Sequence, residues 1–146
     1  MSCTVVHVNI RSLRKHWNEF KVISSEISPL VDAFILSEIN IAAEATAQYF
    51  LPGYTITFTT RPSGRGGGIA VFVRDTWSFT NLAVTFSHAE CIALNITNLI
   101  NSVCILAVYR PPSENVRCFL DEFDAALRQF ATYDHLCILG DFNIDT

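Results

Sequence analysis

The sequence has 146 residues, of which 50% are hydrophobic and 16% charged, and its formal net charge is −4. This length predicts one compact domain with no room for a second one, and the acidic balance argues against a protein that binds nucleic acid through a large positive field. An acidic active site is still compatible with this charge, because carboxylates that bind a cation make a site negative until the cation arrives.

The first third of the chain predicts a strand, a helix and a second strand. Residues 4–9 are rich in β-branched side chains, and the apolar residues that follow recur at near-helical spacing up to Pro29. The next apolar run, Phe34–Ser37, has the composition of a buried strand and ends at Glu38. This order is typical of a β-α-β unit. Residues 39–50 are rich in alanine and are expected to be part helix and part loop.

The rest of the chain predicts further strands and one more helix. Residues 54–60 and 69–74 alternate as half-buried strands do, with a glycine-rich hairpin loop between them. The remaining predicted elements are strands at 91–96 and 103–109, a helix with an apolar face from Val116 to Phe130, and a strand at 135–139. Helices mixed with strands, followed by several strands that look antiparallel, predict an α/β sandwich with helices outside paired sheets.

Polar residues lie where several predicted strands end. Asn9, Glu38 and Asp141 each follow an apolar run, Tyr109 ends another, and Asn143 lies two residues beyond Asp141. Groups at the ends of separate strands can converge on one site. Each also has an ordinary structural interpretation: the Asn and Asp residues as turn formers, Glu38 as a surface carboxylate, and Tyr109 as an aromatic cap.

Five motifs in this order resemble the endonuclease/exonuclease/phosphatase superfamily, and most closely the apurinic-type endonuclease domain of non-LTR retrotransposons. They are Asn9-Ile10-Arg11-Ser12-Leu13, Ser37-Glu38, Gly64 to Val71, Tyr109-Arg110-Pro111-Pro112 and Gly140-Asp141-Phe142-Asn143. Each motif alone is a weak signal, but the ordered set is fairly specific. The resemblance implies a four-layered α/β sandwich of the DNase I-like fold, with residues 1–146 as its N-terminal portion.

Domains of this family continue past the Gly-Asp-Phe-Asn segment to further strands and a terminal Ser-Asp-His motif, which is absent from this sequence. By this resemblance the chain is a domain truncated after Gly-Asp-Phe-Asn. We expect it to supply one sheet with its helices and the first edge of the second sheet. We also expect an active site that is incomplete without the missing Asp and His.

The resemblance also implies roles for the residues at the strand ends. Glu38 becomes the principal metal ligand and Asn9 contributes to the same site. The expected ion is Mg²⁺, with Mn²⁺ as a substitute, because hard cations bind carboxylate and carbonyl oxygens. Tyr109 is expected to hydrogen-bond the scissile phosphate and Asp141 to orient or deprotonate the attacking water. Asn143 is expected to donate to the phosphate or orient the nucleophile.

Three arginines beside these motifs are candidate DNA contacts, with ordinary solvated surface as the alternative: Arg11, Arg65 and Arg110. The glycine cluster lacks the Lys-Ser/Thr pair of a phosphate-binding P-loop and precedes a strand instead of a helix. We therefore expect these glycines to serve turn geometry. None of the four histidines matches the missing catalytic histidine, so none is assigned to the site.

The leading interpretation is a magnesium-dependent endonuclease that nicks DNA to expose a 3′-hydroxyl for reverse transcription. The expected partners are DNA and a fused reverse transcriptase. Two alternatives stay open, a non-catalytic remnant of such a domain and a phosphatase of the same superfamily. No membrane span or signal peptide is visible, and five scattered cysteines indicate reduced thiols. We expect an intracellular protein that is not secreted, and a nuclear one if it acts on DNA.

Overall fold

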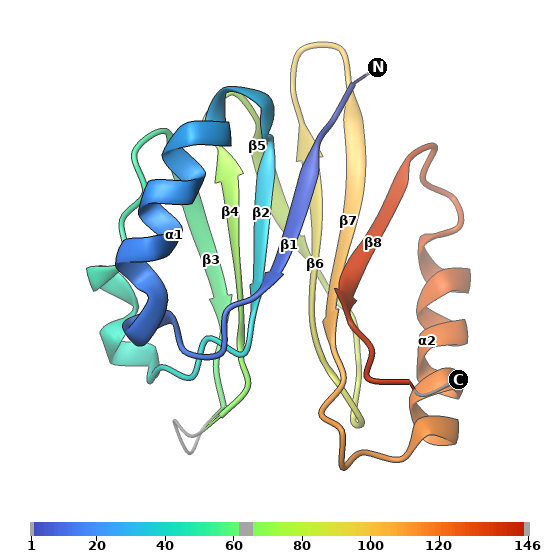
Figure 1. The fold of residues 1–146 in the computed structure, drawn as a ribbon. Coiled ribbons are helices and arrows are strands. Elements are labelled where there is room, and N and C mark those ends of the chain that lie inside the picture. The colour runs from blue at the N-terminus through green and yellow to red at the C-terminus, as the bar shows by residue number, and fades with distance from the viewer. Residues whose placement is uncertain (1, 62–65, 145–146) are drawn as a thin grey trace.

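The computed structural model describes residues 2–61 and 66–144, which form strands and helices (Figure 1). In chain order they are β1 Val5–Asn9, α1 Leu13–Ile27, η1 Ser28–Leu30, β2 Ala33–Ser37, η2 Ala43–Gln48, β3 Tyr54–Thr59, β4 Ile69–Arg74, β5 Ser78–Leu82, β6 Glu90–Thr97, β7 Ser102–Tyr109, α2 Val116–Phe130 and β8 Leu136–Asp141. Side chains start both long helices, because Ser12 accepts from the Lys15 N–H and Asn115 from the Cys118 N–H.

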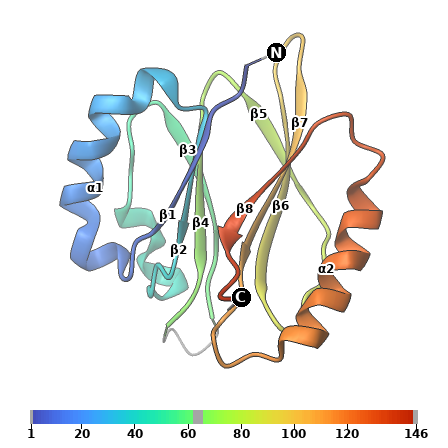
Figure 2. The ribbon, with the colours of Figure 1, turned by 45° about the vertical axis from the view of Figure 1, so that its right-hand side comes forward.

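Two sheets of four strands pack face to face. Their strand orders are β1-β2-β4-β3 and β5-β6-β7-β8, here called the first and second sheets. Helix α1 covers the outer face of the first sheet and α2 the outer face of the second (Figures 1 and 2). The molecule therefore has four layers, helix, sheet, sheet and helix, which confirms the predicted α/β sandwich.

The alternation of side chains along each strand divides the core into three apolar layers. Phe34 and Leu36 of β2 face α1, whereas Ile35, on the other side of the same strand, packs between the two sheets. Strand β2 is buried along its whole length for this reason. The third layer lies under α2 and is centred on Phe119. Burial on both faces explains why the sequence shows continuous apolar runs here instead of alternation.

Two β-α-β units set the direction of the strands that matter for the site. Strands β1 and β2 are parallel and joined through α1, and β7 and β8 are parallel and joined through α2. The carboxyl ends of all four strands lie at the same end of the sandwich, the lower end in Figure 1. Polar residues that follow these strands are therefore brought to one place.

The structure differs from the sequence-based expectation in the second sheet. This sheet has four strands, where only its first edge was expected. One of the four, strand β5 at residues 78–82, was not predicted from the sequence. That strand is Ser-Phe-Thr-Asn-Leu at the border of the sheet, and of its side chains Phe79 packs between the sheets. A border strand with so little apolar surface gives a weak periodic signal. Strand β8 also continues to Asp141, in parallel register with β7.

Four of the five cysteines lie in or against the apolar core. All five cysteines are free, and burial raises the pKa of Cys91 to about 12 and that of Cys104 to about 11. Cys118, in contrast, lies on the exposed side of α2 and outside the core. In the part of the chain that the structure describes, no helix combines the length and apolar content needed to cross a bilayer.

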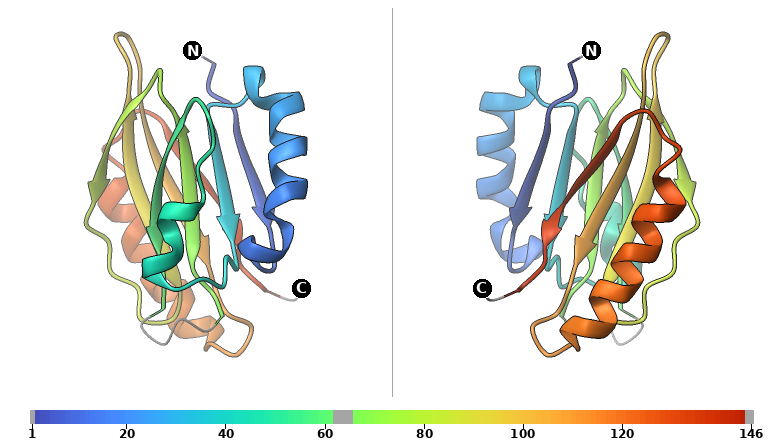
Figure 3. Two further views of the ribbon diagram at one scale, coloured as in Figure 1. Left: turned by 90° about the vertical axis from the view of Figure 1, so that its left-hand side faces the viewer. Right: turned by 90° about the vertical axis from the view of Figure 1, so that its right-hand side faces the viewer.

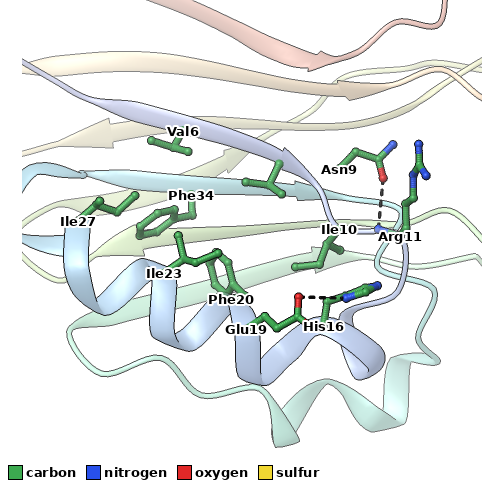
Figure 4. A pocket seen from close by; sticks show the side chains of 11 residues that line it. Val6, Asn9, Ile10, Arg11, His16, Glu19, Phe20, Ile23, Ile27 and Phe34 are labelled. Carbon is green, nitrogen blue, oxygen red and sulfur yellow. Dashed lines mark hydrogen bonds and ion pairs between the residues drawn. The ribbon is translucent and has the colours of Figure 1, made fainter.

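An apolar groove of about 400 Å³ runs between β1 and α1 (Figure 4). Strand β1 is the last strand of the first sheet in the described residues, so its outer edge has no strand partner there. Val8 on β1 is 37% exposed and Ile23 on α1 is 58% exposed, and both line the groove. Asn9 lies at one end of it (Figure 4). An unpaired strand edge beside an apolar groove favours binding of another protein chain.

We expect the 146-residue chain to self-associate in solution through this groove. The double substitution Val8→Lys and Ile23→Lys should shift it toward the monomer, because two charges would then be desolvated on contact. Light scattering over a range of protein concentrations measures the change. Val22→Lys is the matched control, since Val22 is 60% exposed on α1 and does not line the groove. A wild-type chain that stays monomeric at high concentration would contradict the expectation.

Candidate active site

Three predicted site residues lie in direct contact at the carboxyl ends of β1, β2 and β8, between the two sheets. The side-chain amide of Asn9 donates from Nδ2 to the Glu38 carboxylate and to Oδ2 of Asp141, the latter at 2.8 Å. Asn9 ends β1 and Glu38 follows β2 of the first sheet, whereas Asp141 ends β8 of the second sheet. Figure 3 shows the two sheets stacked between the helices. The site is therefore built across the interface of the sheets, by residues far apart in the sequence.

The backbone around this site is strained. All five non-glycine residues with positive φ in the described ranges lie in the loops that leave β1, β2 and β8: Arg11, Ser12, Glu38, Asn40 and Asn143. A left-handed conformation costs roughly 1–2 kcal/mol for most residues with a side chain, and less for asparagine. At Glu38, where φ is 54°, the loop is fixed by its neighbour, because the Ser12 N–H donates to the Glu38 carbonyl at 2.9 Å. Strain of this kind is typical of functional sites, where surrounding contacts impose it.

Tyr109 lies next to the three contacting residues. In the second sheet it is paired with Glu90 of β6 on one side and with Asp141 of β8 on the other. Burial raises the pKa of Tyr109, the charges of Glu38, Glu90 and Asp141 add to the rise, and Arg61 opposes it. The phenol therefore keeps its proton at neutral pH. It can act as a hydrogen-bond donor toward an anionic group in this region.

The glycine-rich hairpin is fastened to the second sheet beside Tyr109. The Glu90 carboxylate accepts from Nε of Arg61 at 2.6 Å and from the N–H of Gly68. A Cβ atom at Gly67 would lie 2.3 Å from Oε1 of Glu90, and Gly67 has a φ of 61°. These glycines serve turn geometry and close packing, as predicted. Gly64 and Arg65, a candidate DNA contact, lie outside the described residues.

The other two candidate DNA contacts differ from each other. Arg11 is exposed beside the site, and its N–H donates to Oδ1 of Asn9 at 3.2 Å. Arg110 is only 2% exposed, and main-chain carbonyls accept from its guanidinium, including that of Phe142 at 2.7 Å. The DNA contact from Arg110 stays a prediction, and the structure favours a structural role instead, because the guanidinium is buried and its N–H groups are occupied.

Asn143 lies close to the other site residues, but its side chain is hydrogen-bonded to the main chain. Its side-chain Nδ2 donates to the Arg110 carbonyl at 2.7 Å. The predicted interaction with a phosphate or nucleophile would require this amide to exchange that partner, or to use its oxygen. Of the predicted catalytic residues, Tyr109 and Asp141 are therefore placed for chemistry more directly than Asn143.

The oxygen atoms at this site fit a hard divalent cation. The NH₂ group of Asn9 lies between the carboxylates of Glu38 and Asp141, which is where a cation would satisfy both negative charges. Carboxylate and carboxamide oxygens, completed by water, are ligands that Mg²⁺ accepts. Among the described residues there is no group of three or more His, Cys, Asp and Glu side chains arranged around one point. The residues that could hold a cation are thus Glu38 and Asn9, whose Oδ1 would have to turn from the Arg11 N–H toward the carboxylates, with Asp141 beside them.

No family model and no curated protein sequence matches the chain. The endonuclease domain of TRAS1, a telomere-specific non-LTR retrotransposon, superposes with a TM-score of 0.74 over 97% of this chain at 14% identity. The fold is that of the DNase I-like endonuclease/exonuclease/phosphatase proteins.

Two other solved structures share this DNase I-like fold. TDP2 from Caenorhabditis elegans has a TM-score of 0.72 over 98% of this chain at 15% identity. The 3′ phosphatase NExo from Neisseria, solved with a product DNA hairpin, has a TM-score of 0.66 over 98% of this chain at 19% identity. This chain spans 61% of the TRAS1 domain, 48% of TDP2 and 58% of NExo. Identities this low establish the fold and leave the substrate open.

Sequence reasoning missed residues that support the site within this DNase I-like fold. His7 lies on β1 two residues before Asn9, and its Nε2 is 3.0 Å from Oγ of the buried Ser37. Burial lowers the pKa of His7, and the charge of Asp141 partly opposes this. The period-two alternation of a strand places His7 and Asn9 on one face, so this signal was present in the sequence. Glu90 gave no such signal, because its neighbours in the sheet depend on the register.

Proposed function

We propose that this chain belongs to a divalent-metal-dependent phosphodiesterase that nicks DNA, of the kind carried by non-LTR retrotransposons. The observation that carries the proposal is the contact of Asn9 with both Glu38 and Asp141 between the two sheets. The five ordered motifs and the similarity to the TRAS1 endonuclease domain support it further. The proposed partners are DNA and, in a full element, a fused reverse transcriptase, and the proposed location is nuclear.

In the proposed reaction each of the four residues Asn9, Glu38, Tyr109 and Asp141 has its own role. Glu38 and Asn9 would hold Mg²⁺ or Mn²⁺, which when bound neutralises charge on the phosphoryl oxygens. Asp141 orients the attacking water and accepts its proton, a role that typically contributes about 10²- to 10⁴-fold in rate. The phenol of Tyr109 donates to a phosphate oxygen and stabilises the charge that develops there. Arg11, which is exposed beside the site, is the proposed contact with the DNA backbone.

The proposal is tested by plasmid nicking in Mg²⁺. The chain would be assayed alone and fused to the C-terminal half of a related domain, because the similar structures are longer than this chain. Cleavage of a 3′-phosphorylated oligonucleotide and of a sugar phosphate is measured in parallel. Nicking that needs the metal supports the proposal. Hydrolysis of the monoesters alone would favour the phosphatase alternative, and no hydrolysis in either form would favour a non-catalytic remnant.

Metal binding is expected to depend on Glu38. Glu38→Ala and the uncharged Glu38→Gln should each weaken Mn²⁺ binding at least about tenfold, because Asn9 and Asp141 then retain a single carboxylate between them. Isothermal titration of the 146-residue chain measures this without any catalysis. Glu44→Ala, an exposed carboxylate on η2, is the matched control. Equal affinity in all four proteins would remove Glu38 from the site.

A further inference from the structure

We propose that Arg110 is a positioning residue that fixes the segment carrying Asp141 and Asn143. Arg110 directly follows Tyr109 at the end of β7, and its side chain is buried with 2% exposure. The catalytic consequence of this inference rests on the proposed function, whereas its structural part does not. No motif argument assigned this role, since the sequence suggested a contact with DNA.

The guanidinium of Arg110 binds the main chain just after β8. Its Nε donates to the Phe142 carbonyl at 2.7 Å, and its Nη2 donates to the Asn143 carbonyl. The main-chain N–H and carbonyl of Arg110 make two more hydrogen bonds with the same segment. The Arg110 N–H donates to the Asp141 carbonyl at 2.9 Å, and Nδ2 of Asn143 donates back to the Arg110 carbonyl at 2.7 Å. Every residue from Asp141 to Asn143 is thus bound to Arg110.

The other side of the same guanidinium is anchored to the turn that leads into α2. Its Nη1 donates to the Glu114 carbonyl and, at 3.3 Å, to that of Pro111. The ring of Phe142 also packs on α2, edge-on to Phe123 with the centroids 5.7 Å apart, and tilted against Phe119 with the centroids 6.2 Å apart. Arg110 therefore ties the segment after β8 to the start of α2, and Phe142 holds it against the helix.

The contacts of Arg110 also fix the backbone conformation of this segment. Asn143 has a φ of 47°, in the left-handed region that asparagine adopts more readily than most residues. Lysine could not replace Arg110, because the planar guanidinium places its N–H groups in a rigid fork that spans both sides, and an ammonium is a single point. Loss of the fork would leave partly buried carbonyls without these donors and free the segment to move. The Asp141 carboxylate would then lose its fixed position beside Asn9.

The structural part is tested by hydrogen exchange followed by NMR in the 146-residue chain. Arg110→Lys and Arg110→Met should each speed exchange of the backbone amide of residue 110 at least about tenfold. The amide of Leu106, in the middle of β7, should keep its wild-type rate, which separates local release from global unfolding. Arg128→Lys is the control, because Arg128 is exposed on α2 and pairs with Asp124. Unchanged exchange at residue 110 in both variants would overturn the inference.

The catalytic part is tested in the form of the protein that nicks DNA. A positioning role predicts that Arg110→Lys lowers kcat at least about tenfold and leaves KM for DNA within about twofold. A DNA contact predicts the reverse, a raised KM and a salt dependence reduced by about one ion, and that result would overturn the inference. If the wild-type protein does not nick DNA, the proposed function fails, and the exchange experiment still decides the role of Arg110.

Discussion

Asp141→Asn is expected to lower the rate of DNA nicking by about 10²-fold or more while the fold stays intact. The substitution is nearly isosteric, and the amide oxygen of the new side chain can still accept the 2.8 Å hydrogen bond from Asn9. What is lost is a carboxylate able to take a proton from water, which typically contributes 10²- to 10⁴-fold. Single-turnover nicking of supercoiled plasmid in Mg²⁺, in the form that is active, measures the loss.

The control for this experiment is Asp121→Asn, which removes the same charge from an exposed position on α2. Tyr109→Phe should lower the rate less than Asp141→Asn does, because it deletes one hydrogen-bond donor and keeps the ring in its place. Circular dichroism spectra should match for all variants. A wild-type rate in Asp141→Asn would show that another group activates the water.

Gly140→Ala is expected to destabilise the chain by about 3 kcal/mol or more, at or above the upper end of the usual range for overpacking. A Cβ atom at Gly140 would lie 1.8 Å from the carbonyl oxygen of Val108, its partner on β7. That neighbour is backbone within a sheet, so the clash is relieved only by moving β8. Since β8 carries Asp141, the same movement should disturb the candidate site.

Urea unfolding monitored by tryptophan fluorescence measures this loss. Gly53→Ala is the matched control, because Gly53 has a φ of 82° with nothing within 4 Å of its added Cβ atom. Only the backbone conformation opposes that substitution, and it should cost roughly 1–2 kcal/mol. Equal losses in the two variants would mean that β8 adjusts freely next to Val108.

The strands and helices with continuous or periodic apolar residues were predictable from the sequence, whereas β5 was not. Runs such as Phe34–Ser37 are buried on both faces, which gives a strong local signal. Strand β5 depends on its pairing with β6, and the residues of β5 alone do not indicate that pairing. The local sequence predicts a strand or helix well when the apolar side chains of that element are themselves what stabilises it.

The same distinction applies to the candidate site. Asn9, Glu38 and Asp141 were predictable because each follows a recognisable strand, and the structure brings them into contact. The role of Arg110 could not be read from the motif, because burial depends on how β7, β8 and α2 pack. A basic residue beside a catalytic motif looks alike in sequence whether it faces DNA or the main chain.

The two sheets occupy separate stretches of the chain, residues 5–74 for the first and 78–141 for the second. The apolar layer between these two units is completed only when the second sheet forms, and Asn9 and Glu38 leave the ribosome long before Asp141 does. Since the candidate site exists only where the units dock, a nascent chain holds an inert half-site until the second unit folds onto the first. Loosening of this docking would likewise separate Asn9 from Asp141 before either unit unfolds.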